Sequence, residues 1–200
     1  MPSLTNVYLT ENSFRYLSDI TIRGSTHFIP LSRIDIGELY LFIPFTSYAH
    51  CMNILLGSDE VTDLAIGLKA CSFENVTVFD LGKYPKLKTL RIGNSTFSHV
   101  SVLNITGLSE LESVDIGMNS FTKHKNTWEI ASDPNRHFYL KNCPKLKSLK
   151  MGRVSFSDYK VVEIENVDAL EVIEMGDLNE VSYSFKYASL ELKSILIYRE

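Results

Sequence analysis

One apolar pattern returns along the whole chain and limits the fold more than any other feature. Segments such as Leu87-x-x-Leu90-x-Ile92 place three apolar residues at a fixed spacing. Eight copies of this pattern begin at Leu4, Leu31, Val61, Leu87, Leu111, Leu146, Leu170 and Leu192. Their first residues lie 27, 30, 26, 24, 35, 24 and 22 residues apart. A recurring period of about 24 residues predicts a solenoid, in which each repeat buries its apolar edge against its neighbours.

A glycine follows the apolar triplet directly in most copies. These glycines are Gly37, Gly67, Gly93, Gly117, Gly152 and Gly176. Glycine tolerates a positive φ and a close approach of another backbone, so we expect each strand to turn out of a sheet at this point.

The second half of each repeat contains pairs of apolar residues that alternate with other side chains. The pairs are Phe79 and Leu81, Leu103 and Ile105, Phe138 and Leu140, and Val162 and Ile164. A period of two is the spacing of a strand rather than of a helix. We therefore expect short extended segments here, with long helices as the alternative.

Two longer segments resemble the leucine-rich repeat, whose pattern is LxxLxLxxNxL. They are Leu4-x-x-Val7-x-Leu9-x-x-Asn12-x-Phe14 and Leu111-x-x-Val114-x-Ile116-x-x-Asn119-x-Phe121. The runs Ile92 to Phe97 and Met151 to Phe156 are also similar to the IGxxAF runs of BspA-like leucine-rich repeats of bacteria and protists. The resemblance implies a horseshoe-shaped repeat solenoid with a parallel β-sheet on its concave face. Together with the period-two pairs, it predicts a convex side of short extended segments and turns with few or no long helices.

The chain departs from the leucine-rich pattern at one position. Ser95 and Val154 stand where that pattern has asparagine. The asparagine ladder of the family is therefore incomplete, and we expect the turn after each strand to depend on glycine instead.

The repeats form a single array over residues 1–200, with two irregular stretches. Residues 122–136 lengthen one repeat and should leave the scaffold as a loop. Trp128, the only tryptophan, either packs on the core or contacts a partner from this loop. Phe42 to Asn53 is interpreted as an enlarged turn.

The two ends of the sequence lack a polar cap. The chain begins inside a repeat at Met1 and stops at Glu200, just after a predicted strand. We expect the chain to be part of a longer array, and the alternative is a short chain that closes its ends by dimerisation or fraying. Uncapped end strands would allow edge-to-edge self-association.

Charged residues recur at the outward positions of the triplet and alternate in sign. The second position carries Lys88, Glu112, Lys147, Glu171 and Lys193, and the fifth carries Arg91, Asp115, Lys150 and Glu174. A ladder of salt bridges across the sheet is the favoured interpretation, and a charged groove for a peptide or protein is the alternative. The candidate partner-binding residues are Tyr8, Asp35, Arg91, Asp115, Lys150, Glu174 and Trp128.

Several function classes find no support in the sequence. The near balance of 20 basic and 24 acidic residues gives no basic surface for nucleic acid, and no apolar run is long enough to span a bilayer. No catalytic, metal-binding or nucleotide-binding motif occurs, so we expect no catalytic residues, no metal and no cofactor. Cys51, Cys71 and Cys143 are few and widely spaced, which favours buried free thiols over a disulfide or a reactive thiol.

The resemblance implies a protein-interaction scaffold that is not an enzyme and whose partner is another protein or a peptide. The alternatives are a regulatory or targeting segment of a larger multidomain enzyme and an adhesin-like surface protein. Because no signal peptide is visible, the cytoplasm is the default compartment.

Overall fold

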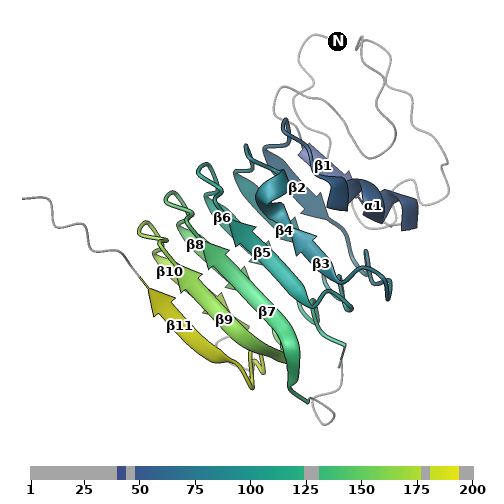
Figure 1. Cartoon of the computed structure of the whole chain (residues 1–200), viewed down its shortest axis with the longest axis vertical. Helices are drawn as coiled ribbons and strands as arrows, with labels where there is room; N and C mark the ends of the chain where they lie inside the picture. Colours follow the sequence, from purple (N-terminus) through teal and green to yellow (C-terminus); the bar gives the residue numbers. More distant parts are fainter. Residues whose placement is uncertain (1–39, 44–47, 124–130, 177–180, 194–200) are drawn as a thin grey trace, which may run out of the picture.

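The structure is a computed structural model, and it describes residues 40–43, 48–123, 131–176 and 181–193. The described chain is a parallel β-solenoid (Figure 1). Its elements in chain order are β1 (Tyr40–Ile43), α1 (Tyr48–Leu56), β2 (Asp63–Ile66), β3 (Val78–Asp80), a 3-10 turn (Leu81–Lys83), β4 (Thr89–Ile92), β5 (Val102–Thr106), β6 (Ser113–Ile116), β7 (Asp133–Lys141), β8 (Ser148–Met151), β9 (Tyr159–Glu165), β10 (Val172–Met175) and β11 (Ser189–Lys193).

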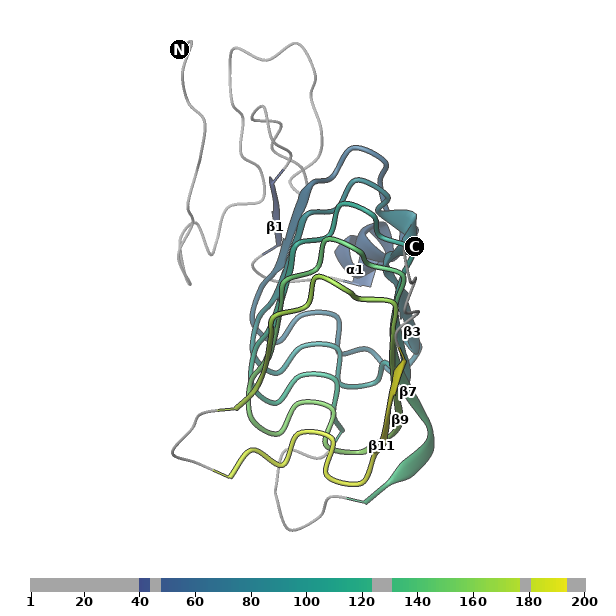
Figure 2. The ribbon, with the colours of Figure 1, turned by 90° about the vertical axis from the view of Figure 1, so that its left-hand side faces the viewer.

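The strands form two parallel sheets, and the chain passes from one to the other in each coil. The first sheet has six strands in the order β1-β2-β4-β6-β8-β10. The second sheet has five strands in the order β11-β9-β7-β5-β3. Figure 2 shows the coils nested behind one another, with the second sheet on the side opposite β1. The prediction of a repeat solenoid is confirmed, and short extended segments form the second half of the repeats from β3 onward. In the coil that begins with β1, helix α1 stands there instead.

The apolar triplet forms the first sheet, and its register is the one that the repeat predicts. Leu90 pairs with Val114 and Val114 pairs with Leu149, so equivalent residues of successive repeats lie side by side. In β4, β6 and β8 the second and fourth residues are buried and the third is exposed. Because successive side chains of a strand point to opposite faces, the triplet fills the core and leaves the intervening residue in solvent.

A column of aromatic rings runs through the core between the two sheets. Phe97 stacks on Phe79 and Phe121 with ring centroids 4.6 and 5.2 Å apart. The column continues through Phe156 to Phe185 with spacings of 4.8 and 4.9 Å. Phe97, Phe121 and Phe156 each lie five residues after the last residue of their triplet, so stacking of the coils brings one ring above the next. Phe79 belongs to β3, and Phe185 lies ten residues after Met175.

In the coils of the first sheet from β2 onward, the turn after the strand contains two residues with positive φ, which are separated by one residue. The pairs are Lys69 and Cys71, Ser95 and Phe97, Asn119 and Phe121, Val154 and Phe156, and Tyr183 and Phe185. A β-branched residue such as Val154 rarely adopts a positive φ, which is 66° here. The asparagine position of the leucine-rich pattern is therefore a left-handed turn position in this chain.

Hydroxyl groups between the two left-handed residues connect the coils. Thr96 Oγ1 donates to the Gly67 carbonyl at 2.9 Å, and Ser120 Oγ donates to the Gly93 carbonyl at 2.8 Å. Ser155 repeats the bond at 2.6 Å. The side-chain ladder in the turn is thus made by serine and threonine, one position after the expected asparagine.

The glycines at the strand ends allow close contact between coils. A Cβ atom on Gly152 would lie 2.4 Å from the Met118 nitrogen, and one on Gly117 would lie 2.7 Å from the Asn94 nitrogen. Of the two explanations offered for these glycines, close backbone approach applies at both positions. Gly176 differs, since its φ is +75°.

Two predicted segments differ in the structure. The stretch Phe42 to Asn53, expected as an enlarged turn, contains the end of β1 and most of α1. Leu192, expected to begin a further copy of the triplet, lies in β11 and pairs with Ile164 in the second sheet. The copies that begin at Leu4 and Leu31 lie outside the described residues.

Candidate functional site

The outer face of the first sheet brings together four of the predicted partner-binding residues. Arg91, Asp115, Lys150 and Glu174 are exposed on β4, β6, β8 and β10. The register aligns each with the next, because Arg91 pairs with Asp115, Asp115 with Lys150, and Lys150 with Glu174. Opposite charges are therefore neighbours along the whole row.

Only one neighbouring pair in this row is an ion pair within 4.0 Å. Lys150 Nζ lies 3.1 Å from Glu174 Oε2, and both side chains are about half exposed. The second charged row contains no ion pair among Lys88, Glu112, Lys147 and Glu171, all of which the structure describes. Lys193, also expected in this row, lies instead on β11 of the second sheet, where it forms an ion pair with Glu191. Of the predicted ladder, only the pair between Lys150 and Glu174 is thus formed. The other charged side chains of these rows remain accessible to solvent or a partner.

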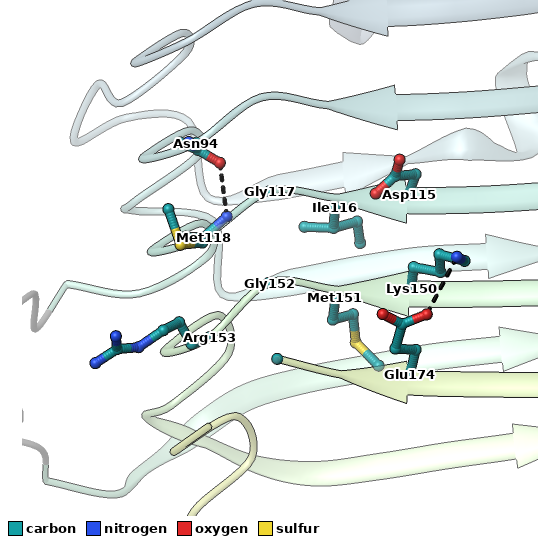
Figure 3. A pocket seen from close by; sticks show the side chains of 11 residues that line it. Asn94, Asp115, Ile116, Gly117, Met118, Lys150, Met151, Gly152, Arg153 and Glu174 are labelled. Atoms are coloured by element: carbon teal, nitrogen blue, oxygen red, sulfur yellow. Dashed lines mark hydrogen bonds and ion pairs between the residues drawn. The ribbon is translucent and has the colours of Figure 1, made fainter. Parts of the chain in front are cut away.

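A depression of about 260 Å³ lies where β6, β8 and β10 end (Figure 3). Its lining includes the charged side chains of Asp115, Lys150, Glu174 and Arg153. Its other lining residues are Asn94, Ile116, Gly117, Met118, Met151, Gly152 and Gly176. The side chains present acidic and basic groups in one small area.

The turns beside the depression are held by a hydrogen bond between coils. Asn94 Oδ1 accepts from the Met118 backbone N–H at 2.8 Å. Gly117 and Gly152 form the wall between the charged side chains and the turns (Figure 3). Because these glycines already contact the backbone of the neighbouring coil, the shape of the wall is set by the stacking itself.

The outer face of the second sheet carries a separate charged group. Lys141 Nζ lies 2.6 Å from Glu163 and 3.4 Å from Glu165. The hydrogen bond with Glu163 raises the pKa of the Lys141 ammonium group, although partial desolvation opposes it. This group balances its own charges on neighbouring strands, so we regard it as part of the scaffold.

Sequence reasoning missed a buried ion pair at the end of the long repeat. Arg136 is fully buried, and its guanidinium lies 2.8 Å from Asp158 Oδ1. The same group donates to the carbonyls of Phe121 at 3.0 Å and Ser98 at 2.5 Å. A burial signal was present in the sequence, because Arg136 has the same strand parity as the inward residues Phe138 and Leu140.

This finding corrects the boundaries of the expected loop over residues 122–136. Thr122 and Arg136 are both buried, and β7 begins at Asp133. The last part of the segment is therefore strand and core. Trp128 lies outside the described residues, as do Tyr8 and Asp35, so their proposed roles stay predictions.

The cysteines also differ from the favoured interpretation. Cys51 of α1 and Cys71 of the turn before β3 form a disulfide, and both are fully buried. Cys143 is free and buried, and burial raises the pKa of its thiol. The pairing could not be read from the spacing of the cysteines, because it depends on the packing of α1 against the turn.

The described residues offer few other chemical groups. They contain no set of three or more His, Cys, Asp or Glu side chains arranged to hold a metal ion. No helical segment among them combines the length and apolar character that a membrane-spanning helix requires. Comparisons with protein-family models, with curated proteins and with solved structures found no match.

Proposed function

We propose that this chain is a protein-interaction scaffold and that the outer face of the first sheet binds an extended segment of a partner protein. The observation that carries the proposal is the ordered row of exposed charged side chains beside the depression. Arg91, Asp115 and Lys150 stand on consecutive neighbouring strands at a fixed register. Parallel strands lie about 4.8 Å apart, so the face offers charges at regular, rigid intervals.

A rigid face lowers the cost of binding, because few groups must be ordered when a partner docks. The residues under the row are the buried triplet, and the turns beside it are fixed by backbone contacts between coils. Specificity would come from the alternation in sign, since a partner must present charges in the complementary order. We propose no catalytic activity for the chain itself.

We further propose that the repeats belong to the leucine-rich class and that the BspA-like type is the nearest description. The LxxLxL pattern and its placement on the parallel strands of the first sheet support this assignment. The serine and threonine ladder in place of asparagine is the main departure. A structure of the chain bound to a partner segment would reveal whether the first sheet is the concave face of a horseshoe.

Selection of peptide ligands from a random library tests the proposed function. We expect ligands whose binding falls at least about tenfold when Arg91, Asp115 and Lys150 are replaced together by Ala, because interface charges contribute on this scale. The matched control replaces Lys141, Glu163 and Glu165 on the second sheet by Ala and should leave binding unchanged. Failure to obtain ligands, or ligands that respond equally to both triple variants, would contradict the proposal.

A further inference from the structure

The last described strand of the first sheet has a neighbour on one side only. β10 pairs with β8, and no other described strand pairs with it in this sheet. The N–H groups of Val172 and Gly176 donate to carbonyls of the β8 segment at 3.1 and 2.7 Å. Since N–H directions alternate along a strand, the N–H groups of Ile173 and Met175 point to the side on which no described strand lies.

The inward side chains of β10 are exposed, unlike their counterparts on β2, β4, β6 and β8. Ile173 is 40% exposed and Met175 is 36% exposed. The equivalent residues of the preceding strand, Leu149 and Met151, are 0% and 3% exposed. A strand added at the edge would cover these two side chains if it supplied apolar residues at the same positions.

The charges indicate what kind of strand fits. Strands β4 and β8 belong to the basic segments Lys88-Thr-Leu-Arg-Ile92 and Lys147-Ser-Leu-Lys-Met151, and β6 and β10 belong to acidic segments. The acidic strand β6 has a basic strand on each side. The acidic strand β10, with Glu171 and Glu174, has a basic strand on one side only.

We propose that β10, on the side where no described strand pairs with it, binds an extended partner segment with the pattern basic-x-apolar-basic-apolar as an added parallel strand. Its two basic side chains would lie beside Glu171 and Glu174, and its two apolar side chains would cover Ile173 and Met175. Its backbone would pair with the outward N–H and C=O groups of β10. This proposal rests on the proposed scaffold function and names a site and a partner class for it.

The chain provides both the probe and its control. The probe is an end-blocked fluorescent peptide with the sequence of residues Lys86 to Gly93, KLKTLRIG. The control peptide has the sequence of residues Glu110 to Gly117, ELESVDIG, which keeps the length and apolar pattern but reverses the charges. Both are titrated with the whole 200-residue chain at low salt and followed by fluorescence anisotropy.

We expect KLKTLRIG to bind at least about tenfold more tightly than ELESVDIG, because like charges placed side by side are strongly unfavourable. The double variant Glu171→Lys/Glu174→Lys should reverse this preference. The matched control Glu163→Lys/Glu191→Lys makes the same charge change on the second sheet and should keep the preference. Circular dichroism establishes that each variant is folded.

Hydrogen exchange gives a second measurement that locates the peptide. Bound KLKTLRIG should slow exchange in the segment of Ile173 and Met175 and leave β4 unchanged. Absence of binding, equal binding of the two peptides, or protection elsewhere would overturn the proposal. So would a dimer of the chain that Glu171→Lys/Glu174→Lys dissociates, because a second copy would then occupy the edge. If library ligands still map to Arg91, Asp115 and Lys150, only the edge proposal fails and the scaffold function stands.

Discussion

In the coil that begins with β1, helix α1 takes the place that a strand of the second sheet takes in later coils. At the β10 end the inward side chains are exposed. Cys51 and Ile54 of α1 are 0% and 1% exposed, but Ile173 of β10 and Leu190 of β11 are 40% and 53% exposed. Coils of a solenoid bury their apolar edges only against neighbours. Within the described residues, a non-repeating element covers the core at the first coil, whereas no described strand covers the inward side chains of β10 and β11.

The attachment of α1 is both covalent and polar. Cys51 is joined to Cys71, which occupies the position that phenylalanine holds in the aromatic column of later coils. The Tyr84 hydroxyl donates to the Ile54 carbonyl at 2.6 Å, and Lys83 Nζ donates to the Leu55 carbonyl at 2.8 Å. These contacts fix the helix over the end of the second sheet.

The largest expected change in the free energy of unfolding comes from the aromatic column. Its size should differ between a ring inside the column and the ring beside β10. Phe97→Ala should lower the free energy of unfolding by about 3 to 5 kcal/mol, because it removes a fully buried ring and leaves a cavity. Phe185→Ala should cost clearly less, since Phe185 is only partly buried. Urea unfolding measures both, and equal losses would contradict the idea that the β10 end is open.

The disulfide should be the next largest contribution. Cys51→Ser/Cys71→Ser should cost about 2 to 4 kcal/mol, because it releases a cross-link that restricts the unfolded chain. Urea unfolding of the wild-type chain with and without a reductant should show a loss of similar size. Unfolding that does not respond to the reductant would disprove a stabilising cross-link.

The hydrogen bond under α1 gives a smaller effect. Tyr84→Phe keeps the ring and removes the hydroxyl. We expect the free energy of unfolding to fall by about 1 to 2 kcal/mol, because the buried Ile54 carbonyl loses its hydrogen bond. Tyr187→Phe, at an exposed tyrosine near β11, serves as the control and should change nothing measurable. A Tyr84→Phe chain with wild-type thermal stability would show that α1 is held by other contacts alone.

The smallest effect is expected on the charged row. Lys150→Ala should cost about 0 to 1 kcal/mol, because the pair with Glu174 is half exposed and screened by solvent. The loss should shrink further at high salt. If the free energy of unfolding fell by more than about 2 kcal/mol, the row would be a structural ladder rather than a surface available to a partner.

Much of the fold followed from the sequence, because the repeat is local. The triplet pattern correctly predicted which residues of β4, β6 and β8 are buried. The period-two pairs correctly predicted the strands of the second sheet. Leu81 was a minor exception, since it begins a 3-10 turn. Four of the predicted partner-binding residues share one face, as the repeat register requires.

Other features could not be predicted, because the repeat does not include them. Helix α1 places Cys51 and Ile54 on one face, but the segment has no counterpart in later repeats that would identify it. The register error at Leu192 arose because an apolar residue of the second-sheet pattern also fits the first position of the triplet. Arg136 was assigned to a loop because a charged residue in a polar segment is usually exposed.

The sequence by itself determined the solenoid, the residues that face its core, and the alternation of charge along its outer face. These are periodic properties, and a fixed register turns them into rows. The tertiary structure alone decided that α1 and a disulfide cover the core at the first described coil, that Arg136 and Asp158 are paired inside the core, and that Lys150 and Glu174 of the charged row form an ion pair. The reason is physical: each of these depends on the distance between groups that are far apart in the chain, and periodicity fixes which coil a residue occupies without fixing what lies beside it.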